Sequence, residues 1–504
     1  MKSLLTLLLS AQLALANISP ADTLKTPIRV WGNFKSTHVL YNQELNPFVY
    51  YPNISNQSYL DIFLLKNNFT AGIRLESYLE PQVGMPNEMQ GWGVASKFLK
   101  YKNKNIELGL GNHYEQFGNG LILKTQEQRA IGMDNSIDGV WGNFKLRKIT
   151  LKSLTGKQRM GFKHANAWVS GLDFELKNRL KSNTLLLGFS DVLKVEKSEE
   201  TLSKNNELVN AMTFRTGIQG KKISVNIEYA IKSNEPIQNS SIQYSRGQAF
   251  VGIVDWSNNK NAVVLHLKHT ENMDFRSERG TRLQTALINF IPNFTKLNTY
   301  RLLTLYPYAS QVAGETGGQL DWTIFTETGA ELNANFSLYQ QPRFIEAAMP
   351  LYRELNLEYS KDLSEDSKIR LLANYAHFNK GIVLGGFPEI VKYQAIVADF
   401  TRKISKNLSI NTQAQHLYTR QDKGSWALAL VDLRIKSKWS IFVTDEFNYS
   451  QNEHYYQVGS NLNLGSKTLG ISYGKVREGL FCVGGVCQII PEYEGLSINF
   501  GINF

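Results

Sequence analysis

Two cysteines near the carboxyl end form the most specific short motif of the sequence. They are Cys482 and Cys487, and the two residues at the centre of the run between them are Gly484 and Gly485. Paired glycines allow the tight backbone reversal that a small disulfide ring requires. A redox-active pair and half of a metal site are the alternatives, but no histidine or acidic cluster nearby supports a metal. The motif predicts a structural disulfide in an exported protein.

No other pattern in the sequence predicts chemistry on a substrate. A nucleophile elbow, a His-Glu-x-x-His helix and a glycine-rich phosphate loop are all absent. His266 and His269 are three residues apart, which places them on opposite faces of a strand rather than in a chelating pair. We therefore predict no enzyme, no catalytic residue, no metal and no cofactor. A serine and histidine pair of a barrel hydrolase stays open, because spacing alone does not reveal such a pair.

Carboxylates recur on one side of segments whose other side is apolar. If the apolar side faces lipid, the carboxylates face an enclosed lumen together with many Asn and Gln side chains. Few of these inward positions are basic, and rings of carboxylates favour cations, so a lumen that disfavours anions is one hypothesis. An ordinary polar interior is the other. The candidate lumen residues are Glu76, Glu107, Asp173, Glu175, Glu228, Asp321, Glu331, Glu354 and Glu358.

The segments that must position these carboxylates alternate between apolar and polar residues with a period of two. This period is the signal of a β-strand. The segment from Ile223 to Ile231 shows it, and so does the last segment, from Leu496 to Phe504. In hydrocarbon every backbone N–H and C=O must be paired, so a sheet that spans a membrane has to close on itself. The alternation thus predicts strands of a closed wall.

Three features favour a membrane barrel over a row of secreted β-sandwiches. The alternation runs along the whole mature chain, whereas sandwich domains end after about 100 residues. Short turns such as Asn67-Asn68 alternate with long polar segments, as tight periplasmic turns alternate with long external loops. Aromatic residues gather at strand ends, as an interfacial girdle requires. These aromatic residues are Tyr78, Tyr101, Trp256, Tyr339, Trp426, Trp439 and Tyr449.

We predict an all-β fold, a single large transmembrane antiparallel β-barrel with short periplasmic turns and long external loops. Counting the hairpins gives about 24 strands, within a range of about 22 to 26, and places both termini in the periplasm. Two strand-like pieces, residues 121–125 and 300–305, break the even count if each is taken as one strand. They lie in two long segments, residues 113–138 and 270–314, which are expected to shield the barrel outside or to fold into its lumen.

The amino end predicts export. Residues 4–16 are mostly apolar, follow Lys2 and end in a small-x-small site. Residues 1–16 are therefore predicted to be a signal peptide, residues 17–27 a short periplasmic segment and residues 28–504 the barrel. The net charge of +11 comes from 55 basic and 44 acidic residues. No nucleic-acid fold signature accompanies it, so we expect anionic membrane lipid and lipopolysaccharide as partners rather than nucleic acid.

Several motifs together resemble an uncharacterised family of outer-membrane proteins from Bacteroidota. They are residues 30–36, residues 113–123, residues 133–135 with Gly139, residues 306–311 with Gly314 and Glu315, and the loop of Cys482 and Cys487. The terminal Phe504 is similar to the carboxyl-terminal aromatic residue by which the outer-membrane assembly machinery recognises barrels. The resemblance implies fold and location, and carries no site residues across.

Two functions fit this prediction. A porin-like channel or transporter would pass hydrophilic solutes, narrowed by its long loops. A scaffold barrel would instead hold a partner protein in its lumen or on its rim, within a surface export or envelope-assembly complex. Function depends on sites rather than on the fold, so the sequence leaves both functions open.

Overall fold

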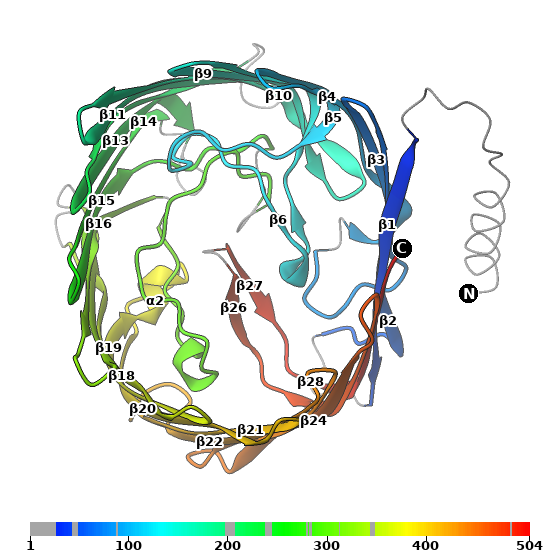
Figure 1. Ribbon diagram of the computed structural model, residues 1–504, viewed down its shortest axis with the longest axis vertical. Coiled ribbons are helices and arrows are strands. Elements are labelled where there is room, and N and C mark those ends of the chain that lie inside the picture. Colours follow the sequence, from blue (N-terminus) through cyan, green and yellow to red (C-terminus); the bar gives the residue numbers. More distant parts are fainter. Residues whose placement is uncertain are drawn as a thin grey trace, which may run out of the picture.

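The strands of the computed structural model form one closed ring (Figure 1). The structure describes residues 27–42, 49–86, 89–196, 207–236, 244–278, 281, 285–311, 313–342, 348–483 and 486–504. Its main sheet has 24 strands, each antiparallel to its neighbours, and β1 pairs with β28 to close the ring. The predicted all-β barrel of about 24 strands is therefore confirmed.

The wall strands follow one another around the ring in sequence order. They are β1 (Arg29–Tyr41), β2 (Ile54–Lys66), β3 (Phe69–Tyr78), β4 (Gly91–Lys102), β5 (Ile106–His113), β8 (Ile137–Leu146), β9 (Ile149–Met160), β10 (Lys163–Leu180), β11 (Asn183–Glu196), β12 (Glu207–Gln219), β13 (Ile223–Pro236), β14 (Tyr244–Ser257), β15 (Asn261–Glu271), β16 (Gly314–Phe325), β17 (Ala330–Gln340), β18 (Pro350–Ser364), β19 (Ser367–Asn379), β20 (Ile390–Ser405), β21 (Leu408–Tyr418), β22 (Trp426–Ile435), β23 (Trp439–Asn448), β24 (Glu453–Asn463), β25 (Lys467–Val476) and β28 (Tyr493–Asn503).

Short elements lie in the longer connections between wall strands. They are β6 (Glu127–Gln128), η2 (Arg129–Ile131), β7 (Met133–Asp134), η3 (Leu302–Thr304), α2 (Lys380–Val383), β26 (Gly479–Val483) and β27 (Val486–Ile490). The helices among the described residues are all too short, or too polar, to cross a membrane.

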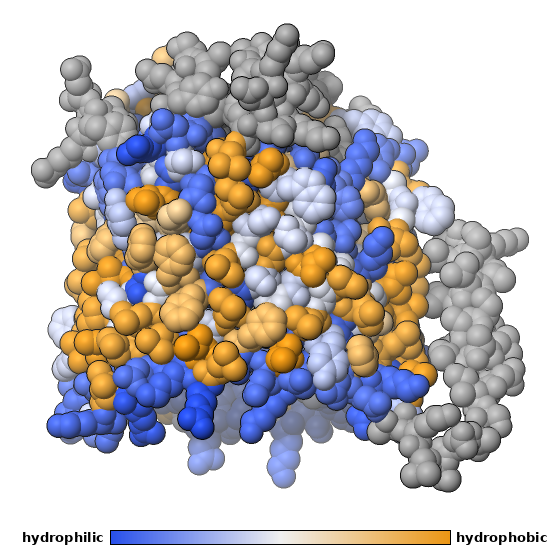
Figure 2. Space-filling view, turned by 90° about the horizontal axis from the view of Figure 1, so that it is seen from above, coloured by the Kyte–Doolittle hydropathy of each residue, from blue (hydrophilic) through white to orange (hydrophobic). Residues whose placement is uncertain are grey.

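The period of two in the sequence becomes the two faces of the wall. In β13, Ile223, Ile227 and Ile231 are exposed on the outside, whereas Glu228 and Ala230 are buried on the inside. Figure 2 shows the result on one side of the barrel, an apolar band between two hydrophilic rims. Such a band is the surface that a barrel presents to hydrocarbon.

The seam between the first and last strands joins the two ends of the chain. Thr37 lies opposite Asn499, and their side chains are hydrogen bonded at 2.7 Å. Gly32 and Phe504 exchange both backbone hydrogen bonds, at 2.8 and 3.0 Å. A Cβ atom on Gly32 would lie 2.7 Å from the Phe504 ring, so glycine leaves the space that this ring fills. β28 and β1 are therefore joined by hydrogen bonds and by the packing of the Phe504 ring against Gly32.

Tight turns connect the strands at one end of the ring and longer segments connect them at the other. Asn67, at a tight turn, has a φ of 52°, a left-handed value that asparagine tolerates better than most residues. The two strand-like pieces that broke the even count are not wall strands. Residues 121–125 lie between β5 and β8, and residues 300–305 lie between β15 and β16, with η3 inside them.

The aromatic girdle is only partly as predicted. Trp256, Trp439 and Tyr449 are exposed, but Tyr78, Tyr339 and Trp426 are buried. Alternation turns every second residue of a strand inward, so an aromatic residue at a strand end can face the lumen. The predicted signal peptide, residues 1–16, and residues 17–26 of the predicted periplasmic segment lie outside the described residues.

Candidate functional site

Two long connections fold into the ring instead of standing outside it (Figure 1). We call residues 114–136 inner loop 1, and the described residues between 272 and 313 inner loop 2. Each contacts inward-facing side chains of the wall, as described below. The lumen of the barrel and these two loops together form the candidate functional site.

Inner loop 1 is fixed to the wall at three consecutive residues, 117–119. Phe117 is fully buried, and Gly118 has a left-handed φ of 53°. A Cβ atom on Gly118 would lie 2.5 Å from a carboxylate oxygen of Glu228 and 2.6 Å from Cδ of Arg215. Asn119 then donates its backbone N–H and its side-chain amide to Glu228, at 2.7 and 2.8 Å. An alanine at position 118 would have to displace Glu228 and Arg215 and would also be strained by the left-handed φ, so glycine suits the position best.

A cluster of three arginines and four carboxylates holds the second half of inner loop 1, and Arg74 and Arg129 both contact its fourth carboxylate, Asp61. Arg159 of β9 lies 2.5 Å from both Glu76 of β3 and Asp134 of the loop. Arg74 of β3 lies 2.7 Å from Glu127 of the loop. Glu76, Glu127 and Asp134 are close enough together to hold a metal ion. The guanidinium groups of Arg74 and Arg159 lie within 4.0 Å of these carboxylates. They supply the positive charge that a metal ion would otherwise supply.

Glu115 connects the start of inner loop 1 to the wall. Its carboxylate accepts hydrogen bonds from Lys152 at 2.7 Å and from its own neighbour Gln116 at 2.9 Å. Burial alone would raise the pKa of Glu115, but the bonds from His113, Lys152 and Gln116 outweigh burial and lower it. The carboxylate is therefore held in its charged form at neutral pH.

Inner loop 2 is anchored by a fully buried ion pair. Lys268 of β15 contacts the carboxylate of Glu315 in β16, and neither side chain is exposed. The Lys268 ammonium also donates to the Pro292 carbonyl at 2.6 Å and to the Ser310 hydroxyl at 2.9 Å. Tyr308 donates its hydroxyl to the same Glu315. A single wall pair thus binds both arms of the loop.

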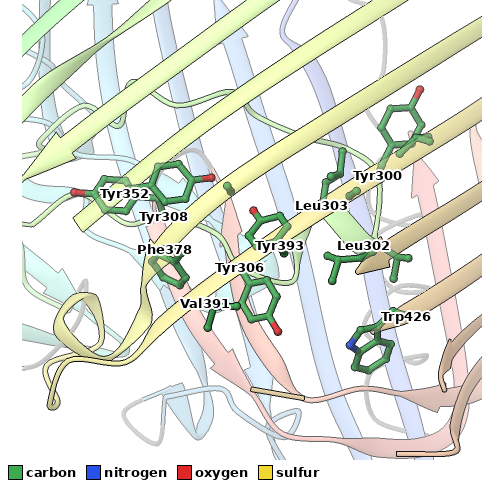
Figure 3. Close-up of a cluster of buried hydrophobic side chains, with 14 of the residues drawn as sticks. Tyr300, Leu302, Leu303, Tyr306, Tyr308, Tyr352, Phe378, Val391, Tyr393 and Trp426 are labelled. Atoms are coloured by element: carbon green, nitrogen blue, oxygen red, sulfur yellow. The ribbon is translucent and has the colours of Figure 1, made fainter. Parts of the chain in front are cut away.

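Aromatic packing extends this anchor across the wall (Figure 3). Tyr308 stacks on Tyr339 and Tyr352, with ring centroids 5.2 and 4.9 Å apart. Tyr306 lies 5.1 Å from the ring of Tyr393. These rings belong to one buried apolar cluster that also holds Leu302, Leu303, Phe378 and Trp426. Inner loop 2 is thereby packed against the inner face of β17 to β22.

The two inner loops also pack against each other. Leu121 and Ile122 of inner loop 1 share a buried cluster with Phe275 and Ile288 of inner loop 2. Backbone hydrogen bonds join the loops, from Lys124 to Ile288 at 2.9 Å and from Phe290 to Gly120 at 2.9 Å. The loops therefore form one continuous structure inside the barrel.

Polar residues of inner loop 2 reach the middle of the wall strands. Lys296 lies 2.7 Å from Glu358 of β18, and the Tyr300 hydroxyl lies 3.1 Å from Asp399 of β20. Nearer the end with the long connections, Arg301 lies 2.5 Å from Glu446, the third residue from the end of β23. Burial and the nearby Asp399 charge raise the pKa of Tyr300 to about 12. These contacts narrow the lumen at mid-depth.

The nine predicted lumen carboxylates fall into two groups in the structure. Glu76, Asp173, Glu228 and Glu354 are buried, and Asp321 and Glu358 are partly buried beside inner loop 2. Glu107 pairs with Lys102 and Glu175 pairs with Lys177, both near tight turns, whereas Glu331 is exposed. Inner loop 1 reaches Glu228 directly and Glu76 through Arg159, and inner loop 2 reaches Glu358. The second group lies closer to the opposite mouth.

The expectation that few inward residues are basic is wrong. The buried basic residues of the wall are Arg159, Lys194, Arg215, Lys232 and Lys268. Arg215 of β12 lies 2.5 Å from Asp173 of β10, and Lys232 of β13 lies 2.7 Å from Glu235. The signal was present, because these residues stand at inward positions of the same alternating strands. Arg159 and Arg215 neutralise two of the predicted lumen carboxylates, Glu76 and Asp173, whereas Lys194, Lys232 and Lys268 pair with Glu235 and Glu315.

The two cysteines lie directly opposite each other in the hairpin of β26 and β27, which Figure 1 shows over the interior of the ring. Directly opposed residues of antiparallel strands have Cα atoms about 4.5 to 5.5 Å apart, within the range of a disulfide. We expect Cys482 and Cys487 to be joined in protein isolated without reductant. Alkylation before and after reduction, read by mass spectrometry, tests this, and two alkylated thiols in the unreduced sample would contradict it.

Comparison with known proteins identifies a family but no activity. The model of a family of unknown function, DUF6029, matches residues 1–504. No curated protein sequence matches the chain. Many solved structures share the barrel at low similarity.

Three of them illustrate this level of similarity. The siderophore receptor PirA from Pseudomonas aeruginosa is 6% identical, with 94% of this chain and 80% of that chain covered and a TM-score of 0.43. The copper transporter OprC is 7% identical, with 96% and 82% covered and a TM-score of 0.42. The outer membrane transporter YddB from Escherichia coli is 8% identical, with 94% and 81% covered and a TM-score of 0.41. These values transfer no ligand and no mechanism.

Proposed function

We propose that this chain, which belongs to the DUF6029 family of unknown function over its whole length, is an outer-membrane channel for small hydrophilic solutes. One observation carries the proposal. A closed wall with an apolar outside encloses polar side chains, and two anchored loops narrow the space between them. A barrel of this strand number without inner loops would leave a wide aqueous pore.

The depth of the loops supports a narrowed channel. Glu358 and Asp399 stand near the middle of β18 and β20, and they mark how far inner loop 2 descends. Nearer to the tight turns, inward residues such as Glu107, Glu175 and Asn411 are only partly buried. The part of the lumen between inner loop 2 and the tight turns is therefore lined by polar side chains.

The proposed location follows from the two rims of the wall. Tight turns at one end suit the periplasmic side, and long connections at the other suit the cell surface. The apolar band between them would contact outer-membrane lipid, and the external rim would contact lipopolysaccharide. Both termini would then lie in the periplasm.

Permeation through purified protein tests the channel. We expect discrete conductance steps in planar bilayers, and swelling of liposomes that is faster with small sugars than with large ones. Folded protein, identified by its shifted migration in unboiled gels, is compared with a boiled sample of the same preparation. Folded protein that is electrically silent and does not permit swelling would contradict the proposal.

The scaffold alternative has less support. A partner held in the lumen would need the space that inner loops 1 and 2 occupy among the described residues. A partner bound to the external rim remains compatible with the wall. The stable co-purification of a second protein with an electrically silent barrel would favour this alternative.

Phe504 is proposed as the residue by which the assembly machinery recognises the barrel. Its ring also covers Gly32, so recognition must be separated from packing at the seam. For Phe504→Ala we expect several-fold less folded protein in the outer membrane of cells, and an unchanged folding yield in detergent without the machinery. An equal loss in both settings would assign Phe504 to seam packing alone.

A further inference from the structure

Two hairpins of the wall carry the same arrangement of side chains on their inner face. In β16 and β17, Asn333 donates its amide to Asp321 at 2.8 Å and to Thr323 at 2.9 Å. In β20 and β21, Asn411 donates its amide to Asp399 at 2.6 Å and to Thr401 at 2.9 Å. The two sets have the same spacing along the chain, as Asp-aromatic-Thr followed by Asn. We call them the first and the second Asp-Asn-Thr sites.

Each site has a further carboxylate on the next strand. Glu358 of β18 lies directly opposite Asn333, and Asp432 of β22 lies directly opposite Asn411. In each case the amide donates both of its hydrogens to Asp and Thr, which leaves its oxygen as an acceptor beside the second carboxylate. The Asn411 oxygen accepts one hydrogen bond from the Gln413 amide, at 3.3 Å, and keeps a second lone pair. An amide oxygen and a carboxylate on neighbouring strands therefore lie side by side at two places on the lumen wall.

A primary ammonium already occupies the first site. The Lys296 ammonium lies 2.9 Å from the Asn333 amide oxygen and 2.7 Å from the Glu358 carboxylate. Inner loop 2 carries this lysine across the lumen to the wall. A carboxylate and a carbonyl oxygen side by side suit an alkylammonium group, which donates three hydrogen bonds.

Within the described part of the chain, no lysine takes the corresponding place in the second site. Arg434 pairs with one oxygen of Asp432 at 2.9 Å, but its side chain is 66% exposed. The other oxygen of Asp432 has no hydrogen-bond partner. Arg370 lies opposite Asp399 in register, and no ion pair joins them. Asp399 itself accepts the Tyr300 hydroxyl at the edge of the site.

We infer that the second Asp-Asn-Thr site, formed by Asp399, Asn411 and Asp432, binds the ammonium group of an amine-bearing solute. The ligand takes the place that Lys296 takes in the first site, and it displaces the exposed Arg434 from Asp432. An exposed arginine pair contributes little, so a solute competes with it effectively. This inference deepens the proposed channel function by naming a class of solute.

Ligand-observed NMR on the folded protein in detergent tests the site without requiring conductance. The probe is n-butylammonium, which reproduces the end of a lysine side chain, and tetramethylammonium is the control cation without N–H donors. We expect the double variant D399N/D432N to bind n-butylammonium about tenfold more weakly or worse. E331Q removes an exposed inward carboxylate outside both sites and is expected to bind it as the wild type does.

The first site supplies a second, opposite test. K296M removes the resident ammonium, so the triple variant K296M/D399N/D432N is expected to regain binding at Asn333 and Glu358. Equal binding of both cations to the wild type would overturn the inference. So would unchanged binding by D399N/D432N, or an equal loss in E331Q. Because folded protein is used throughout, a silent channel would refute the proposed function and leave the site measurable.

Discussion

Replacing Lys268 by methionine is expected to destabilise the folded barrel by about 3 to 5 kcal/mol, the typical cost of leaving one charge of a buried pair without its partner. Both Lys268 and Glu315 are fully buried, and the ammonium also binds Pro292 and Ser310 of inner loop 2. Equilibrium unfolding of protein refolded in lipid vesicles, followed by tryptophan fluorescence in urea, measures the loss.

The control removes the other charge as well. In K268M/E315Q no unpaired charge remains, and we expect most of the lost stability to return, because an apolar or neutral replacement of a buried pair is often tolerated. A K268M protein within about 1 kcal/mol of the wild type would show that Glu315 finds another partner. The pair would then not be the anchor of inner loop 2.

Replacing Gly118 by alanine is expected to release inner loop 1 from the wall. The new methyl group would meet Glu228 and Arg215 within 2.6 Å, and the left-handed φ of 53° adds backbone strain. The reporter is a cysteine at Leu121, a fully buried position, in a chain with Cys482 and Cys487 changed to serine. We expect G118A to raise the labelling rate of this cysteine by about tenfold or more.

Gly329 offers a matched control for backbone strain. It also has a left-handed φ, of 74°, but nothing lies within 4 Å of the position of its Cβ atom. G329A should therefore leave labelling at position 121 unchanged. Equal labelling in the wild type and in G118A would show that the glycine contact does not hold the loop.

The wall was predictable because its physics is local to each strand. Alternation in segments such as Ile223 to Ile231 fixes which side chains face lipid, and the need to pair every backbone group fixes closure. The predicted even number of strands also holds. Residues 121–125 and 300–305, which broke it, belong to the inner loops and not to the wall. The direction of strand-end aromatic residues such as Trp426 was not predictable, because it depends on what packs inside.

The interior was less predictable because its contacts join distant parts of the chain. The sequence shows Glu228 as an inward carboxylate, but not that Asn119 and Gly118 come to rest against it. The prediction that few inward residues are basic failed for the same reason, because Arg215 and Lys268 were not recognised as partners of inward carboxylates. The repeated Asp-aromatic-Thr pattern of Asp321 and Asp399 is visible in the sequence, yet its meaning requires the register of the strands.

The central claim is that inner loop 2 narrows a pore enclosed by a closed barrel. The ends of this loop already meet, because the Asn272 N–H donates to the Ala313 carbonyl at 2.9 Å. A short glycine-serine turn can therefore replace residues 273–312 while β15 and β16 stay paired. The direct test is the single-channel conductance of this variant and of the wild type, each shown to be folded by its migration in unboiled gels. The account predicts a conductance about twofold or more above that of the wild type, and an unchanged conductance would contradict it.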